Sequence, residues 1–165
     1  MSKTSLTDLN EHTRELSEPA ERASDSGERS GGCLCGAARY VVAGEPLRVG
    51  LCHCTDCKRT SGSAYAAFAV WPRSAYQGTG KLGTFKGRSF CPMCGSRVVS
   101  LRDDEAEIMV GSLDTAPSDL IPSYELWTPR REGWLHNLPW ADQYEADRSD
   151  EPRNWRQARR AHQDG

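Results

Sequence analysis

The distribution of cysteines constrains this chain more than any other feature. All seven cysteines of the 165 residues lie between positions 33 and 94. They form three clusters, which read Cys33-Leu34-Cys35, Cys52-His53-Cys54-Thr55-Asp56-Cys57 and Cys91-Pro92-Met93-Cys94. A single cysteine is often a buried apolar residue without a metal, whereas thiolates clustered at such spacings are soft ligands that suit zinc. The pattern predicts a small domain organised by zinc.

The seven ligands divide most simply into four and three. A structural zinc takes four protein ligands, and a catalytic zinc takes three and keeps one position open. A C-x-C pair in a strand places both sulfurs on one face, and Gly95 after the last pair permits the tight turn of a zinc knuckle. We expect a closed structural site from Cys33, Cys35, Cys91 and Cys94, and an open site from Cys52, Cys54 and Cys57. The alternative, in which the triplet shares a ligand with another pair, leaves thiols without a metal.

Charge and composition exclude several classes of protein. The net charge is -2, so the chain has no basic field that would favour nucleic acid or an anionic membrane. The first residues lack the apolar segment of a secretory signal, and no apolar run has the length of a membrane span. An odd number of cysteines cannot pair completely in disulfides, which favours a reducing compartment in which the thiols stay free. We expect a soluble, cytoplasmic protein.

The apolar residues are unevenly distributed along the chain. Residues 1–30 contain no Val, Ile, Phe, Tyr or Trp, so we expect a disordered acidic tail there. The zinc domain is expected over 31–145, followed by a polar, arginine-rich C-terminal tail over 146–165. Short β-rich runs predict an antiparallel, mainly β fold with one helical turn at 55–61. The expected strands are 38–42, 47–51, 64–71, 81–85, 88–91, 97–101, 107–110 and 124–127.

Four motifs in order resemble a known family over about residues 31–139. They are Gly32-Cys33-Leu34-Cys35-Gly36-Ala37, the run from Cys52 to Ser63, Phe90-Cys91-Pro92-Met93-Cys94-Gly95-Ser96, and Gly111-Ser112-Leu113-Asp114. They are similar to those of the glutathione-dependent formaldehyde-activating enzymes, a family that includes centromere protein V. The resemblance implies a β-tent fold of antiparallel sheets, a structural zinc on the outer cysteine pairs and a second zinc on the triplet. It also implies a carbon–sulfur lyase reaction, in which formaldehyde condenses with glutathione to S-(hydroxymethyl)glutathione or the adduct is cleaved.

One stretch departs from the family pattern. Many members have a histidine shortly after the proline in the stretch that corresponds to residues 122–127. This sequence has Tyr124 and Glu125 there.

The triplet is the expected site of chemistry. Zinc with three thiolates carries a net charge of about -1 and favours one more soft ligand, such as a thiol, which it holds as a thiolate. We expect Cys52, Cys54 and Cys57 to form the catalytic centre. The remaining site residues are Asp56, expected as a local acid or base or as a turn cap, and Lys58 and Arg59, expected to bind a substrate carboxylate or to be solvated.

Several further residues have weaker expectations. The ring of His53 is expected to face away from the metal, because neighbouring side chains in a strand alternate. His136 is expected beside the pocket, and Asp114 in a turn hydrogen bond or in catalysis. We expect Trp127, Trp134 and Trp140 in the core or the pocket wall, and assign no role to Trp155.

The sequence thus predicts a zinc-dependent carbon–sulfur lyase that acts on a small thiol and a small carbonyl compound. The alternative is a non-enzymatic zinc module or thiol carrier. The fourth position of the triplet zinc distinguishes the two: open in a pocket for an enzyme, filled by a protein side chain for a module.

Overall fold

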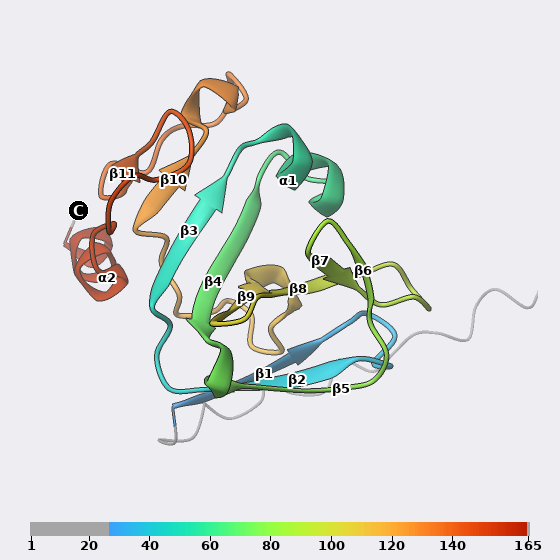
Figure 1. Cartoon of the computed structure of the whole chain (residues 1–165). Coiled ribbons are helices and arrows are strands. Elements are labelled where there is room, and N and C mark those ends of the chain that lie inside the picture. The colour runs from blue at the N-terminus through green and yellow to red at the C-terminus, as the bar shows by residue number, and fades with distance from the viewer. Residues whose placement is uncertain (1–26, 165) are drawn as a thin grey trace, which may run out of the picture.

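The computed structural model describes residues 27–164, and its regular secondary structure consists mainly of strands, arranged in two sheets (Figure 1). The smaller sheet has the order β1-β2-β5, and the larger has the order β11-β10-β3-β4-β9-β8-β7-β6. The smaller sheet comprises β1 (Glu28–Gly32), β2 (Arg39–Ala43) and β5 (Tyr76–Thr79). The larger comprises β3 (Arg48–Cys52), β4 (Ala66–Pro72), β6 (Gly83–Phe85), β7 (Arg88–Phe90), β8 (Arg97–Leu101), β9 (Glu105–Met109), β10 (Tyr124–Leu126) and β11 (Asp142–Gln143).

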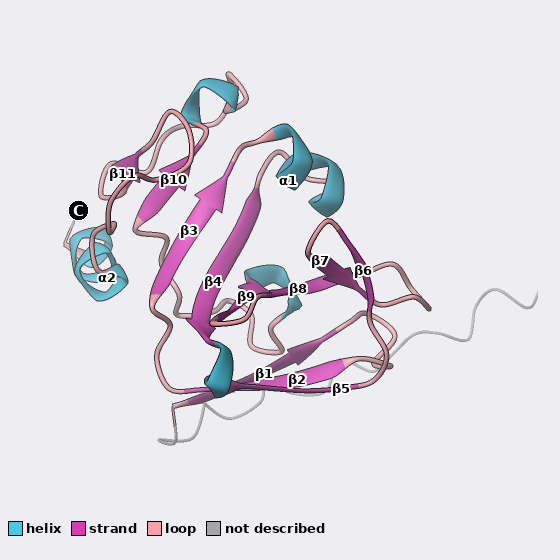
Figure 2. Cartoon of the chain, viewed as in Figure 1, coloured by secondary structure: helices cyan, strands magenta, loops and turns pink. Residues whose placement is uncertain are grey.

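Besides the strands, the described residues form two α-helices and three short 3-10 helices (Figure 2). Helix α1 (Thr55–Ser61) follows β3, and α2 (Trp155–Gln163) lies near the C-terminal end of the described chain. The 3-10 helices are η1 (Arg73–Ala75), η2 (Val110–Ser112) and η3 (Thr128–Arg130). Within residues 27–164, neither α-helix has the length and apolar character needed to cross a bilayer.

Local sequence signals gave several elements correctly. Helix α1 covers the predicted range and ends at Gly62, whose φ of 63° is the left-handed conformation of a glycine C-cap. The predicted hairpin is formed by β6 and β7, with positive φ at both Lys86 and Gly87. A turn of that kind matches the twist of the two strands that it joins.

The expectation of wholly antiparallel sheets is wrong for β10. This strand pairs in parallel with β3 on one side and with β11 on the other. A parallel pair needs a long crossover connection, and here residues 127–141, which include η3, separate β10 from β11. The strand signal at Tyr124 to Leu126 was correct, but strand direction depends on connections that a local pattern does not show.

Both expected tails are corrected in part. Residues 28–30 belong to β1 and pair with β2, for example Arg29 with Val42, while residues 1–26 lie outside the described part of the chain. The C-terminal tail contains α2, in which Trp155 and Ala158 are buried and Trp155 belongs to the core. Residues three apart lie on the same face of a helix, so these two apolar residues are buried together even though the average composition of the tail is polar.

The larger sheet has an apolar cluster on each face. Side chains alternate along β4, so Ala69 and Trp71 enter a core shared with the smaller sheet, whereas Phe68 and Val70 face the opposite side. That opposite side also carries Tyr124 and the cysteine triplet. The fold therefore places the triplet on the outer face of the larger sheet, away from the main core.

Candidate metal centres

Four cysteines meet where the two sheets come together. Cys33 and Cys35 lie in the turn between β1 and β2, and Cys91 and Cys94 lie in the turn between β7 and β8. All four Sγ atoms lie within 4.8 Å of one another, with 3.6 Å between Cys33 and Cys35 and 3.7 Å between Cys35 and Cys91. A disulfide would bring two sulfurs to about 2.05 Å, whereas sulfurs around a tetrahedral zinc lie about 3.8 Å apart. This four-cysteine cluster fits a structural metal ion.

Hydrogen bonds favour the thiolate form of two members of the four-cysteine cluster, Cys33 and Cys94. The backbone N–H of Ala38 donates to Cys33 Sγ at 3.2 Å, which lowers the pKa of Cys33. Ser96 Oγ accepts from the N–H of Leu34 at 3.2 Å and lies 3.3 Å from Cys94 Sγ. Hydrogen bonding from Ser96 lowers the pKa of Cys94 to about 5. Because a metal binds the deprotonated thiol, these contacts favour metal binding by Cys33 and Cys94.

The cysteine triplet forms the second cluster. Cys52 ends β3, Cys54 is the N-cap of α1, and Cys57 lies in the first turn of that helix. Their Sγ atoms also lie within 4.8 Å of one another, and no other His, Cys, Asp or Glu of residues 27–164 joins them. The N–H of Cys57 donates to Cys54 Sγ at 3.4 Å. Hydrogen bonding with Cys52, and at longer range the charge of Arg97, lower the pKa of Cys57 to about 6.

The triplet opens into a cavity of about 630 Å³, which we call the triplet cavity. Phe68, Val70 and Tyr124 give it an apolar side. Its charged lining consists of Arg48, Lys86, Arg88, Arg97, Arg102 and Arg148, against Glu105, Glu107 and Asp147.

Cations exceed acids in that lining even after ion pairing. Arg48 donates to Glu105 at 2.6 Å, and Arg97 lies 3.2 Å from Glu107. Arg88 has a looser partner in Asp56, at 3.7 Å. The Nε atoms of Arg88 and Arg97 are buried without an acceptor among the described residues. The cavity is therefore suited to an anionic ligand.

The cations that the sequence suggested point elsewhere. Neither Lys58 nor Arg59 lines the triplet cavity; Lys58 Nζ contacts the carbonyl of Arg130 at 2.7 Å and pairs with Glu132, and Arg59 is exposed. A helix turns about 100° per residue, so residues directly after Cys57 leave the face that carries the sulfurs. Asp56 is also outside the lining, and it reaches the site through its ion pair with Arg88.

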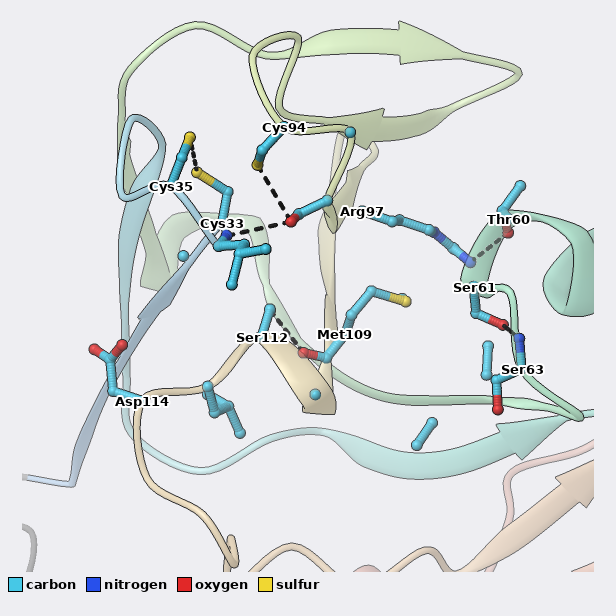
Figure 3. Close-up of a pocket in the computed structure, with 18 of the residues that line it drawn as sticks. Cys33, Cys35, Thr60, Ser61, Ser63, Cys94, Arg97, Met109, Ser112 and Asp114 are labelled. Carbon is cyan, nitrogen blue, oxygen red and sulfur yellow. Dashed lines mark hydrogen bonds between the residues drawn. The ribbon is translucent and has the colours of Figure 1, made fainter. Parts of the chain in front are cut away.

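A second cavity, of about 810 Å³, borders the four-cysteine cluster (Figure 3). Asp114 lies at its edge, where Ser30 Oγ donates to it at 2.6 Å and Arg39 forms an ion pair with it. The hydrogen bond from Arg39 lowers the pKa of Asp114. Asp114 therefore joins the turn after η2 to β1 and β2.

Arg97 lines both cavities. Its Nη1 donates to Thr60 Oγ1 of α1 at 2.9 Å (Figure 3). It therefore links the turn of Cys94 to the helix of Cys57.

One comparison with known proteins identifies the family of this chain. A family model described as "Glutathione-dependent formaldehyde-activating enzyme" matches residues 28–130, which is more than half of the chain. The chain belongs to this family. A crystal structure of a Rhodobacter sphaeroides protein shows 27% sequence identity, covers 53% of this chain and 91% of that chain, and has a TM-score of 0.41. A search of curated proteins gave no match.

All seven cysteines lie within the region that matches the glutathione-dependent formaldehyde-activating enzyme family. So does Glu125, one of the two residues present where many members have a histidine. Glu125 is buried and lies 2.8 Å, through Oε2, from Nε2 of His53. The ring of His53 thus turns to Glu125, and His53 is not part of the triplet cluster. Burial raises the pKa of Glu125, but hydrogen bonds from His53, Leu138, Gln143 and Arg131 outweigh it and lower the pKa to about 2.

The three tryptophans expected in the core or the pocket wall, and His136, differ in how deeply they are buried. Trp127 packs against the apolar cluster next to the triplet, as expected, and Trp140 is half-buried. Trp134 is 68% exposed, so the expectation of a core or wall position is wrong for it. His136 is exposed and lines neither cavity. Both residues lie in a loop that also contains Pro139. The proline and the aromatic residues suggested that the loop is buried, but both side chains are exposed.

Proposed function

We propose that this family member is a zinc-dependent carbon–sulfur lyase, which forms or cleaves the bond between a small thiol and a small carbonyl compound. S-(hydroxymethyl)glutathione is the adduct that the family description suggests. The observation that carries the proposal is the placement of Cys52, Cys54 and Cys57. Their sulfurs converge on the wall of the triplet cavity, and no fourth metal-binding side chain of residues 27–164 joins them.

The two donor sets fit zinc in two different roles. Both consist of thiolates, which zinc prefers to oxygen ligands. The four-cysteine cluster would hold a structural ion, and the triplet would hold the second one. When bound, the second zinc supplies a soft Lewis-acid position at which a substrate thiol is held as a thiolate.

The residues around the triplet supply binding and orientation. The cations of the cavity would pair with substrate carboxylates, which leaves the reacting sulfur beside the cysteines. The apolar side, formed by Phe68, Val70 and Tyr124, reduces access of water. In the forward direction the thiolate attacks the carbonyl carbon, a carbon–sulfur bond forms and the carbonyl oxygen takes a proton. In reverse the hydroxyl loses that proton and the carbon–sulfur bond breaks.

Asp56 is our candidate for the proton transfer. It lies in the first turn of α1, between two cysteines of the triplet in sequence, and its carboxylate approaches Arg88 of the cavity wall. An exposed carboxylate in that position can exchange its proton with water.

Cobalt substitution tests the proposal directly. Adding glutathione to cobalt-loaded protein should change the visible absorption of the triplet ion, and Cys57→Ser should abolish the response. Adding formaldehyde should then give the adduct faster than in buffer. Thiol binding without faster turnover would contradict the lyase and support the thiol carrier, and an absence of thiol binding would contradict both.

A further inference from the structure

Glu125 is a buried carboxylate that is held from several directions. It is 1% exposed. Its Oε2 accepts from Arg131 Nη2 at 2.9 Å and lies 2.8 Å from His53 Nε2. Its Oε1 accepts from the N–H of Leu138 at 2.7 Å and from Gln143 Nε2 at 3.1 Å. Burying a charge is unfavourable unless it is paired and hydrogen-bonded. The carboxylate of Glu125 is therefore stable in this position only while these partners keep their places around it.

The network reaches the triplet through one residue. His53 separates Cys52, the end of β3, from Cys54, the N-cap of α1. Its backbone N–H donates to the carbonyl of Leu126 at 3.0 Å, next to Glu125 in β10. Strand β10 therefore holds both the backbone and the ring of His53. The relative direction of the two neighbouring sulfurs depends on the backbone dihedrals at this position.

We propose that Glu125 is a positioning residue of the triplet, which acts through His53 to hold the sulfurs of Cys52 and Cys54 where one metal ion can bind both. Groups that orient metal ligands commonly change metal affinity when they are mutated. The proposal rests on the proposed function only in that the triplet binds a metal. It requires no particular thiol or reaction.

The proposal also extends the site beyond the region that matches the family. The match ends at residue 130, whereas Arg131, Leu138 and Gln143 all donate to Glu125. The segment 131–143 is thus part of the scaffold of the triplet. Its contribution is a set of donors that keep the carboxylate in place and charged.

Metal affinity provides the test. Glu125→Gln keeps the size of the side chain but places an NH₂ group among donors. It should lower the zinc affinity of the triplet by about 10–100-fold, measured by competition with a chromogenic chelator, and alter the cobalt absorption of that site. The affinity of the four-cysteine cluster should be unchanged. Glu132→Gln is the matched control. Glu132 belongs to the segment 131–143, but its side chain is 44% exposed and pairs with Lys58 instead of contacting Glu125 or His53.

A double-mutant cycle separates positioning from a general loss of stability. If Glu125 acts through His53, the effects of Glu125→Gln and His53→Gln on triplet affinity should be clearly less than additive. Additive effects, an unchanged triplet affinity in Glu125→Gln, or equal losses at both clusters would overturn the proposal. Where Glu125→Gln does not fold, Arg131→Gln provides the same test, because it removes the guanidinium that donates to Glu125 through both Nε and Nη2, at a position with 18% side-chain exposure. Zinc affinity is measured without thiol or carbonyl. The test of Glu125 therefore does not depend on whether the protein shows lyase activity.

Discussion

Cys35 Sγ lies 3.7 Å from Cys91 Sγ, although 56 positions separate the two residues. Cys35 belongs to the turn between two strands of the smaller sheet, and Cys91 to a turn between two strands of the larger one. An ion bound by the four-cysteine cluster would therefore connect the two sheets. The triplet lies between β3 and α1, close together in sequence, and connects no such distant parts.

The two clusters should differ in their effect on stability. Cys91→Ser should unfold the domain or lower its melting temperature strongly, because structural zinc contributes about 10–16 kcal/mol of apparent folding free energy in small zinc-binding peptides. Cys54→Ser should remain folded and lose only the triplet ion. Circular dichroism melting curves of the two variants test this difference. Equal unfolding of both would make the triplet structural as well.

Metal content provides a second prediction. Protein purified without a chelator should carry about two zinc ions per chain, one for each cluster. Elemental analysis together with a thiol titration measures both quantities. A single zinc with three reactive thiols would contradict metal binding by the triplet. An absence of metal with seven free thiols would contradict metal binding by both clusters.

The sequence predicted the parts of the site that depend on short-range spacing. The division into four and three cysteines follows from pair geometry, and the two clusters of the structure have those members. Helix α1 was predictable because Gly62 ends it. The outward turn of His53 followed from the alternation of side chains in a strand.

The parts that depend on long-range pairing were not predictable in the same way. Arg48, Arg88 and Arg97 come from three different strands and meet only because the larger sheet orders them around one cavity. Nothing local marks them, whereas Lys58 and Arg59 were conspicuous because they follow Cys57 directly. The role of Glu125 likewise requires the parallel pairing of β10 with β3, which depends on a crossover.

Helix α2 should contribute to stability despite its polar composition. Trp155 is 3% exposed and belongs to the main core, so Trp155→Ala should lower the free energy of unfolding by about 3–5 kcal/mol. Gln157→Ala, at an exposed position of the same helix, is the control and should have little effect. Chemical denaturation of the zinc-loaded proteins measures both. A similar small change in the two variants would show that the helix is not docked in solution.

The ion pair of Glu105 with Arg48 should make stability depend on pH. The hydrogen bond from Arg48 lowers the pKa of Glu105 in the folded protein. The associated stability is therefore present above the unfolded pKa of about 4.3 and is lost as the pH falls through the lower folded value. Glu105→Gln should cost about 1–3 kcal/mol at pH 7, and the difference from the wild type should shrink below about pH 4. Denaturation midpoints at several pH values test this, and a constant difference would contradict it.

Arg88 should bind a substrate carboxylate, whereas Arg59 should not. Arg88 lines the triplet cavity, its Nε is buried without an acceptor among residues 27–164, and its Asp56 partner is 3.7 Å away. A charged hydrogen bond contributes about 1.5–3 kcal/mol, so Arg88→Gln should weaken glutathione binding to cobalt-loaded protein by about 10–100-fold.

Two controls make that result specific to the carboxylate. Arg59→Gln removes an exposed cation of α1 that lies outside the cavity, and it should leave glutathione affinity unchanged. The binding of 2-mercaptoethanol, a thiol without a carboxylate, should be the same in both variants and the wild type. Equal weakening by the two arginine substitutions would indicate a general electrostatic effect. Weaker binding of both thiols in Arg88→Gln would indicate damage to the triplet itself, because only the cysteines and their ion contact a neutral thiol.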